Sequence, residues 1–362
     1  MTEYGYLRAL LDAKGIGISR ALELYKHFGS ATEVFAQRHS LPVLVRNALI
    51  PSEDTLRQAE AEEAFCAKNN IRILTYNDAD YPQRLCECAD APLLLYYKGV
   101  ADLNVKHIVA VVGTRRITER GKDTVQAFCR ELAGLLPDVL IVSGLAYGVD
   151  IHAHRAALQF GMDTVGVLAH GLDRIYPSYH RPVAVEMVSH GGLLTEYPSG
   201  TTPHAGHFVS RNRIVAGMSD AVVVVESAAK GGALITAHLA QEYNRDVFAF
   251  PGRINDEMSA GCNNLIKHNA AALITEATDL TENMLWTNTE SDRKIIQPNL
   301  FPELSAEEKL LVECLSEAEQ KTISELSQQT GLAFSKTMAS LLALELKGIV
   351  KGLPGGIYRL QV

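Results

Sequence analysis

The feature that most constrains this chain is an alternation of short apolar runs with longer amphipathic segments between residues 71 and 286. Each apolar run is continuous rather than alternating with polar residues, which is typical of strands buried on both faces. The runs are "HIVAVVG", "VLIVSG", "TVGVLAHG", "GLLTEY", "AVVVVES", "DVFAFPG" and "ALIT". Helix-length segments such as "ERGKDTVQAFCRELAGLL" separate them. The pattern predicts an α/β fold with a doubly wound, extended Rossmann-like and mostly parallel sheet.

The sequence on either side of this pattern predicts further domains. Residues 1–65 have apolar positions at helical spacing and predict a small helical domain, SAM-like (sterile α motif) or helix-hairpin-helix-like. Residues 66–286 are expected to form the Rossmann-like domain, and residues 287–302 lose periodicity and predict a linker. Residues 303–362 predict three helices and a hairpin, the layout of a winged helix. The leucines of its third helix, at 341, 342, 344 and 346, are expected mostly in the core.

Glycine and basic residues gather after the predicted strands. The edge of a doubly wound sheet at which its parallel strands end is where such a sheet binds its ligand, and glycine lets a ligand approach the backbone. Free N–H groups at helix N-termini and guanidinium groups both bind anions. The sequence therefore predicts an anion pocket, with basic residues Arg115, Arg116, Arg174, Arg211, Arg213, Lys230 and Arg253 near it.

Two common nucleotide-binding motifs are missing from the sequence. The first parallel strand is followed by G-T-R-R rather than G-x-G-x-x-G, and no G-x-x-x-x-G-K-[ST] loop occurs. We therefore expect no cofactor and favour a pocket for a nucleic-acid backbone. The net charge of −8 argues against diffuse binding of nucleic acid but leaves room for a confined basic pocket.

The sequence favours neither a metal site nor a catalytic group. His152 and His154 are expected to cap a helix, and His204 and His207 lack a third ligand. Cys86 and Cys88 do not have zinc spacing, and Ser143 lacks a G-x-S-x-G setting. An acid–base role and pairing with a pocket arginine both stay open for Glu196, Asp220 and Glu226. The N-terminus has charges inside its apolar segment, so we expect a cytoplasmic protein without membrane contact.

Eight motifs in unbroken order resemble those of the DprA/Smf family of bacterial DNA-processing proteins. They are "VVGTRR", "SGLAYGVDIHAH", "GVLAHGLDRIYP", "LLTEYPSGTTP", "FVSRNRIVAGMSDAVVVVE", "GGALITAHLA", "VFAFPG" and "GCNNLI". The similarity covers roughly residues 70–275, and the helical N-terminus and winged helix resemble extensions found in that family. The resemblance implies a non-enzymatic protein of natural transformation and competence that binds single-stranded DNA, dimerises and helps to load RecA recombinase.

The resemblance also implies a set of DNA-binding residues. Arg115 would contact phosphate, Arg211 and Arg213 would line the same pocket with Asn212 as a hydrogen-bonding partner, and Phe208 would stack on a base. Gly113, Gly231 and Gly232 would allow close backbone approach. The full expected set is Gly113, Thr114, Arg115, Arg116, Phe208, Arg211, Asn212, Arg213, Lys230, Gly231 and Gly232. Tyr147, His180, His204 and His207 depart from common family residues, so binding is expected to depend more on the three arginines.

Two further points bear on function. A phosphoribohydrolase-like nucleotide-processing enzyme is the alternative on a similar fold, although "KGGALITAHLA" lacks the signature glutamate of such enzymes. Residues 303–362 contain six Lys or Arg against eight Glu. A DNA-reading domain normally presents a basic surface, so we expect this domain to make protein contacts or only weak DNA contacts.

Overall fold

The protein consists of two compact units, Met1–Thr287 and Asn288–Val362. A computed structural model describes residues 2–286, 304–316, 320–347, 349–353 and 355–360. The predicted linker, 287–302, lies outside the described residues. Within the described residues, no helix is long and apolar enough to cross a membrane.

The first unit is built on a nine-stranded sheet with the order β1-β2-β6-β5-β4-β3-β7-β8-β9. Neighbouring strands from β6 to β9 in this order run parallel, whereas β2 is antiparallel to both β1 and β6. The expected mostly parallel sheet is therefore confirmed, although β1 and β2 are not among the strands that the sequence predicts. The strands are β1 (Arg72–Thr75), β2 (Leu94–Gly99), β3 (Ile108–Val112), β4 (Leu140–Ser143), β5 (Thr164–Val167), β6 (Gly191–Thr195), β7 (Ala221–Val224), β8 (Asp246–Ala249) and β9 (Ala272–Leu273).

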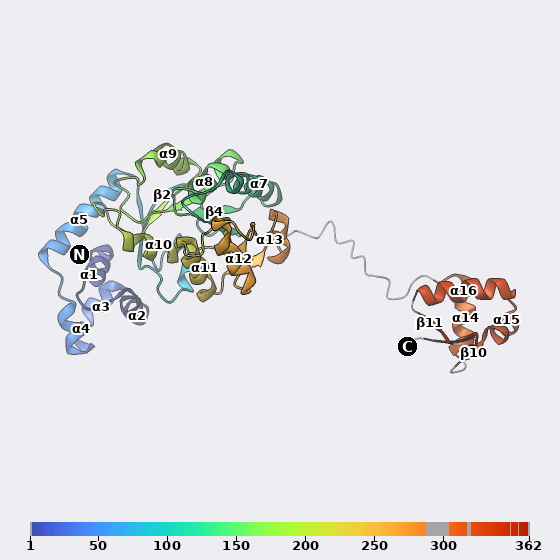
Figure 1. Ribbon diagram of the computed structural model, residues 1–362. Helices are drawn as coiled ribbons and strands as arrows, with labels where there is room; N and C mark the ends of the chain where they lie inside the picture. The colour runs from blue at the N-terminus through green and yellow to red at the C-terminus, as the bar shows by residue number, and fades with distance from the viewer. Residues whose placement is uncertain (1, 287–303, 317–319, 348, 354, 361–362) are drawn as a thin grey trace. The chain divides into compact units, whose positions relative to one another are not determined.

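Helices cover both faces of this sheet, as the continuous apolar strands require (Figure 1). Successive side chains of β3 point to opposite faces. Ile108, Ala110 and Val112 pack in the cluster that includes α10, α11 and α12, while Val109 and Val111 pack with α7, α8 and α13. The helices and short 3₁₀ turns of this part are α6 (Gln83–Cys86), α7 (Glu119–Leu135), α8 (Val149–Gln159), η2 (Ser178–His180), α9 (Arg181–Ser189), α10 (Ala205–Gly217), α11 (Gly232–Glu242), η3 (Glu257–Ser259), α12 (Ala260–Lys267) and α13 (Ala277–Asn283).

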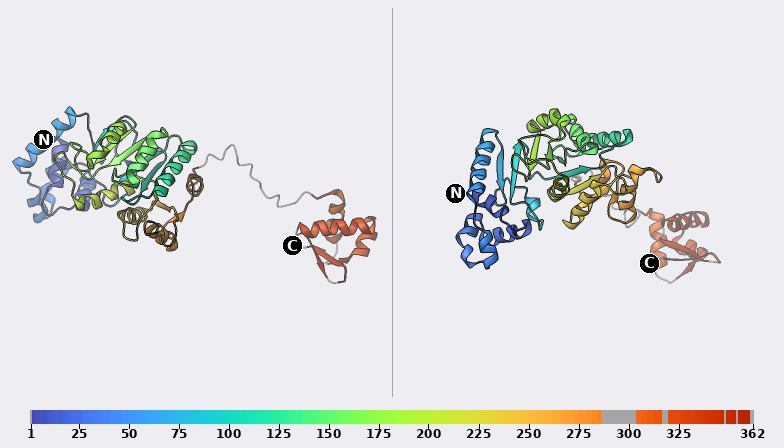
Figure 2. Two further views of the ribbon diagram at one scale, coloured as in Figure 1. Left: turned by 45° about the horizontal axis from the view of Figure 1, so that its top comes forward. Right: turned by 60° about the vertical axis from the view of Figure 1, so that its left-hand side comes forward.

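The N-terminal residues form helices that pack against the β1–β2 edge of the sheet (Figure 2). They are α1 (Glu3–Leu11), α2 (Ile18–Phe28), α3 (Ala31–Ala36), η1 (Arg38–Ser40), α4 (Val43–Ala48) and α5 (Glu53–Lys68). Their buried side chains share one cluster with Leu94 and Tyr96 of β2. The expected domain boundary at residue 65 falls inside α5, so the division of this unit into two domains stays a prediction.

The second unit has the helices and hairpin that the sequence predicts. Its elements are α14 (Ala306–Ser316), β10 (Lys321–Thr322), α15 (Ile323–Thr330), α16 (Phe334–Leu346), β11 (Val350–Leu353) and β12 (Ile357–Leu360). The Thr322 and Glu325 side chains form a capping box that begins α15, and Gly331 ends it at φ 68°. Leu341 and Leu344 are buried in its core, but Leu342 and Leu346 are exposed. The expectation that most of these leucines are buried is therefore wrong, because they lie on two faces of one helix.

Candidate functional site

A pocket of about 820 Å³ opens at the point where the sheet reverses its strand order. From β3 the chain adds β4, β5 and β6 on one side and β7, β8 and β9 on the other. The loops that follow β3 and β7 therefore diverge and leave an opening at the carboxyl ends of the strands. Of the expected site residues, those lining the pocket are Gly113, Thr114, Arg115, Arg116, Phe208, Arg211, Asn212, Lys230, Gly231 and Gly232.

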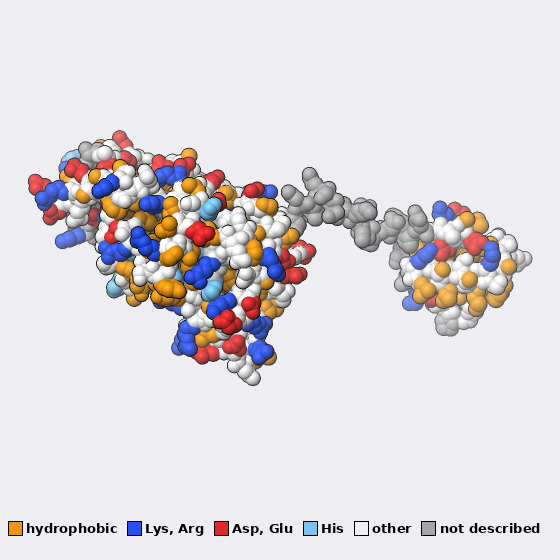
Figure 3. All heavy atoms as spheres, turned by 90° about the horizontal axis from the view of Figure 1, so that it is seen from above, with side chains coloured by type: hydrophobic (Ala, Val, Ile, Leu, Met, Phe, Trp, Pro, Cys, Tyr) orange, Lys and Arg blue, Asp and Glu red, His pale blue; other side chains and the backbone are white. Residues whose placement is uncertain are grey.

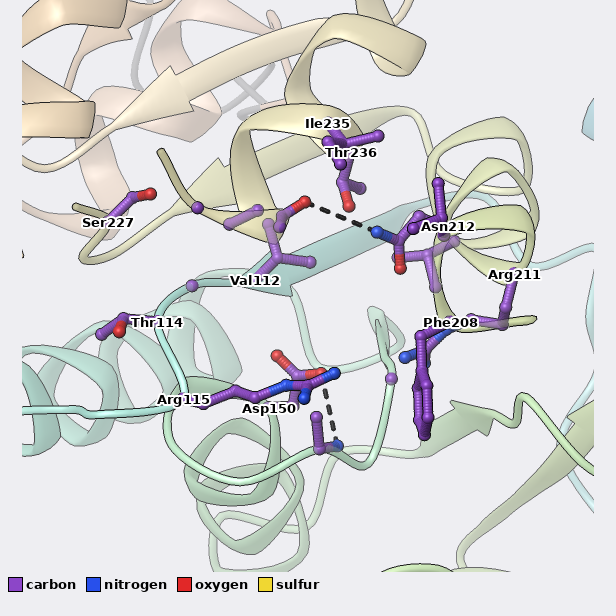
Figure 4. A pocket seen from close by; sticks show the side chains of 18 of the residues that line it. Val112, Thr114, Arg115, Asp150, Phe208, Arg211, Asn212, Ser227, Ile235 and Thr236 are labelled. Carbon is purple, nitrogen blue, oxygen red and sulfur yellow. Dashed lines mark hydrogen bonds between the residues drawn. The ribbon is translucent and has the colours of Figure 1, made fainter. Parts of the chain in front are cut away.

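Arg115 is an exposed cation in the centre of this group (Figure 4). No carboxylate in the described structure lies within ion-pair distance of its side chain. The guanidinium carbon stands 5.1 Å from the centroid of the Phe208 ring, a cation–π distance. The Tyr176 ring lies 5.9 Å from Phe208 on a tilted plane. A cation and two rings thus share one wall of the pocket.

Backbone hydrogen bonds to two other segments fix the loop that carries Arg115. The Thr114 N–H donates to the Glu226 carbonyl at 2.7 Å, and the Thr114 carbonyl accepts from the Val149 N–H at 3.1 Å. Gly148 has φ +80°, and a Cβ there would collide with the Thr114 carbonyl oxygen. A Cβ at Gly113 would collide with the Val149 side chain. Packing against α8 therefore accounts for glycine at 113.

Arg211 and Arg213 point in different directions because they are two residues apart on α10. Such positions do not share a helix face. Arg211 points into the pocket, whereas Arg213 does not line it. The Arg213 guanidinium donates to the Asp90 carbonyl at 2.5 Å and forms a close ion pair with Glu196. The expectation that Arg213 lines the same pocket is wrong, because this side chain is occupied in a buried ion pair.

Arg211 forms the floor of the pocket together with Asp150. Arg211 is 3% exposed, its Nη1 donates to the Val167 carbonyl at 2.5 Å, and its Nε has no partner in the described structure. A Cβ at Gly144 would collide with the Arg211 guanidinium, so glycine there makes room for that group. Burial raises the pKa of Asp150 and lowers the pKa of Arg211, and the attraction between the two opposes both shifts. The floor is thus a buried, charge-compensated layer beneath the exposed cations.

The N-terminus of α11 forms the wall opposite Arg115. Gly231 is the N-cap and makes no side-chain capping bond, so N–H groups of the first turn stay available to a ligand. A Cβ at Gly231 would collide with the Ser227 hydroxyl, which explains that glycine by packing. At Gly232 no atom beyond its chain neighbours and its own helix backbone lies within 4 Å of the Cβ position. The Asn212 side chain donates to the Gly232 carbonyl at 3.4 Å and links α10 to this turn (Figure 4).

The charges on the lining favour an anionic ligand. The basic residues Arg115, Arg116, Arg211 and Lys230 line the pocket, against the acidic residues Asp150 and Glu257. Cations, helix N-terminal amides and a ring suit a phosphate group attached to a flat base. Within the described ranges, no group of three or more His, Cys, Asp or Glu side chains is arranged to hold a metal ion.

The three carboxylates whose role the sequence left undecided each have a structural partner. Glu226 accepts from the Thr118 N–H and hydroxyl, where it fixes the start of α7. Asp220 pairs with Arg84 at 2.6 Å, outside the pocket. Glu196 forms an ion pair with Arg213. Of the three carboxylates, it is therefore the one that pairs with an arginine of the expected set.

Sequence reasoning missed several residues of the pocket. They include Gly144, Ala146, Asp150, Tyr176, Pro203, Ser227 and Met258. His204, which the sequence already associated with the pocket, also lines it. His204 is the N-cap of α10, where its Nδ1 accepts from the Gly206 N–H at 3.2 Å. The position of Tyr176 after the β5 strand is the one sequence signal that could have placed it here, since that strand ends at the same edge.

A family model and several relatives match this chain. The model described as DNA recombination-mediator protein A matches residues 72–285, and the DprA winged helix domain matches residues 297–356. The chain belongs to the DNA recombination-mediator protein A family. A protein Smf of Synechocystis is 31% identical over 99% of each chain. The DNA processing protein DprA of Streptococcus pneumoniae is 40% identical over 62% of this chain and 79% of that protein.

Two solved structures of this family resemble the fold. DprA from Streptococcus pneumoniae superposes with a TM-score of 0.66 at 32% identity, covering 78% of this chain and 98% of that one. DprA from Helicobacter pylori, studied for its single-stranded DNA binding mode, gives a TM-score of 0.53 at 33% identity. That match covers 59% of this chain and 96% of the other. The resemblance that the motifs carry to the DprA/Smf family is thereby confirmed.

Proposed function

We propose that this recombination mediator binds single-stranded DNA in the switch-point pocket, acts without catalysis, and helps to load RecA recombinase onto the bound strand as a homodimer. The observation that carries the proposal is the exposed guanidinium of Arg115 over the Phe208 ring. The Helicobacter pylori relative with a single-stranded DNA binding mode supports it.

The wall of the pocket suits a single strand better than a duplex. A base can stack on an aromatic ring only when it has left its own stack, which a flexible single strand permits at low cost. Phosphates on either side of such a base then meet Arg115, Arg116 or Lys230 and the amides that begin α11. Arg211 contributes from the floor, whereas Arg213 supports α10 from the opposite side.

The direct test is a salt titration of binding to single-stranded and duplex oligonucleotides of the same sequence. We expect tighter binding of the single strand at every salt concentration, with a log–log slope of about −0.7 for each phosphate contacted. Arg130, an exposed arginine of α7 that does not line the pocket, provides the matched control Arg130→Ala. Equal affinity for both DNA forms would contradict the proposal.

Dimerisation and recombinase loading are tested separately. We propose that the chain dimerises through its first unit. Sedimentation equilibrium of the full chain measures whether a dimer forms. Loading is measured as the rate at which RecA covers a single strand that is already coated with single-strand-binding protein. We expect the wild type to accelerate this step and Arg115→Ala to lose the acceleration in proportion to its loss of DNA affinity.

The enzymatic alternative has a simple test of its own. Asp150 lines the pocket and its pKa is raised by burial, as for groups that act as general acids or bases. Incubation with nucleoside monophosphates would release free base if the chain were a phosphoribohydrolase. We expect no release with the wild type. Release that is lost in Asp150→Asn would favour the enzyme instead.

A further inference from the structure

The winged-helix unit has an apolar stripe along the exposed side of α16. Phe334, Met338, Leu342 and Leu346 are 52%, 54%, 58% and 83% exposed, and they follow one another at intervals of four residues. Side chains at this spacing lie on one face of a helix. Among helices in the described part of the chain, α16 is the one with four exposed large apolar side chains. Figure 3 shows hydrophobic side chains on the face of this unit that is turned toward the viewer.

This stripe does not have the chemistry of a DNA-reading surface. α16 follows α15 in the place of the helix that enters the major groove in helix-turn-helix proteins. Phosphates and base edges are recognised by donors such as Arg, Lys, Asn and Gln. The stripe has large apolar side chains instead, and nearby Lys336 is paired with Glu307 at 2.7 Å. An apolar patch of this kind indicates a protein contact.

The stripe is complementary to itself. Ser335, Ala339 and Ala343 each follow one of the large side chains, so a row of small residues runs beside the row of large ones. Two copies of such a helix can pack with the large row of each in the small row of the other. Because both rows are uncharged, two identical surfaces meet without like-charge repulsion, as a two-fold symmetric contact requires.

The size of the stripe favours a tethered copy over a separate partner. The stripe consists of four exposed large apolar side chains, whereas a stable interface involves about 20–30 residues on each partner. One helix face is therefore too small to hold a free protein tightly. Two winged-helix units attached to one dimer meet at an effective concentration in the millimolar range, where a small interface is sufficient.

We propose that the α16 faces of two copies of this chain pair with each other within the dimer. This inference depends on the dimer that the proposed function includes, but not on DNA binding. It assigns the winged-helix unit the role of joining two subunits at a second point. Duplex DNA and the first unit of the same chain are the other surfaces that could cover the stripe, and the experiment below separates them.

The test is cross-linking of the full chain through one introduced thiol on the stripe. Leu342→Cys is treated with a short bismaleimide, next to Gln328→Cys on the exposed side of α15 as the matched control. The wild type, whose cysteines include the partly exposed Cys86 and Cys314, gives the background. We expect Leu342→Cys to form covalent dimer at least tenfold faster than Gln328→Cys, and Met338→Glu in the same chain to remove that advantage.

Equal rates for the two thiols, or no covalent dimer above background, overturn the inference. A thiol at 342 that duplex DNA protects while no covalent dimer forms assigns the stripe to DNA and also overturns it. Sedimentation equilibrium separates this failure from that of the proposed function. A chain that is dimeric but not cross-linked through α16 refutes only the pairing of α16, whereas a monomeric chain refutes the proposed dimer as well.

Discussion

Replacing Arg115 by alanine tests the proposed pocket most directly. Arg115 is exposed and has no acidic partner in the described structure, so its removal should change the free energy of unfolding by no more than about 0.5 kcal/mol. A hydrogen bond between a charged donor and phosphate contributes about 1.5–3 kcal/mol. We therefore expect roughly a tenfold to hundredfold loss of single-strand affinity. The log–log salt slope should become shallower by about 0.7.

The assay is fluorescence anisotropy of a labelled oligothymidine, measured over a several-fold range of salt concentration. Arg115→Lys separates charge from shape. It should keep the salt slope of the wild type, since it keeps the charge, but lose affinity because lysine lacks the planar fork of donors. Arg130→Ala should match the wild type in both slope and affinity.

The salt slope decides the outcome, rather than the affinity alone. The guanidinium also contacts the Phe208 ring, at 5.1 Å. Release of that ring could therefore account by itself for a loss of affinity in Arg115→Ala. If affinity falls while the slope stays that of the wild type, Arg115 positions Phe208 and does not neutralise a phosphate. That result would refute the reasoning.

Further predictions concern the ring, the ion pair, the loop and a buried histidine. Phe208→Leu should lose about 1–3 kcal/mol of single-strand binding with an unchanged salt slope, and a changed slope would contradict a stacking role. Arg213→Met should destabilise the first unit by roughly 3–5 kcal/mol in calorimetry, while the folded variant keeps the salt slope. Gly148→Ala should lower the free energy of unfolding by about 1–3 kcal/mol through backbone strain at φ +80°. It should also weaken DNA binding, because its Cβ would displace the Thr114 carbonyl. A variant with wild-type affinity and stability would refute this. Burial lowers the pKa of His154 to about 3. Below about pH 6.5 the unfolded chain therefore binds a proton that the folded chain does not, so the free energy of unfolding should fall by about 2 kcal/mol toward about pH 5. His154→Gln should flatten this part of the pH profile of the unfolding free energy, measured by urea titration.

The sequence could predict the sheet and the edge at which the pocket lies because both depend on local patterns. A run such as "AVVVVES" is apolar at nearly every position, which a strand with two covered faces can accommodate. Since the carboxyl ends of parallel strands meet at one edge, residues far apart in the sequence could be placed together. Arg115 and Lys230 do line one pocket, although they follow different strands, β3 and β7.

The contacts that depend on tertiary packing could not be predicted in this way. β2 is antiparallel and follows Pro92 in an irregular segment, so it has no place in the alternation of parallel strands and helices. The direction of Arg213 relative to Arg211 depends on both residues lying in the helix α10. Had residues 205–217 been interpreted as a helix, the two-residue spacing from Arg211 would have separated the two arginines. The contacts of Gly148 with Thr114 join two segments whose approach no local pattern indicates.

The glycines and arginines of the pocket divide into those that the fold requires and those that it does not. Gly113, Gly144 and Gly231 are each explained by a neighbouring side chain that a Cβ would displace, and Arg211 has a carbonyl partner. By contrast, no atom lies near the Cβ position of Gly232, and Arg115 has no acidic partner in the described structure. A cation and a bare backbone turn that packing does not require, on opposite walls of one pocket, are best explained by a ligand that contacts both. Variants at these two positions should therefore affect binding with little effect on folding, whereas variants at the others should affect folding first.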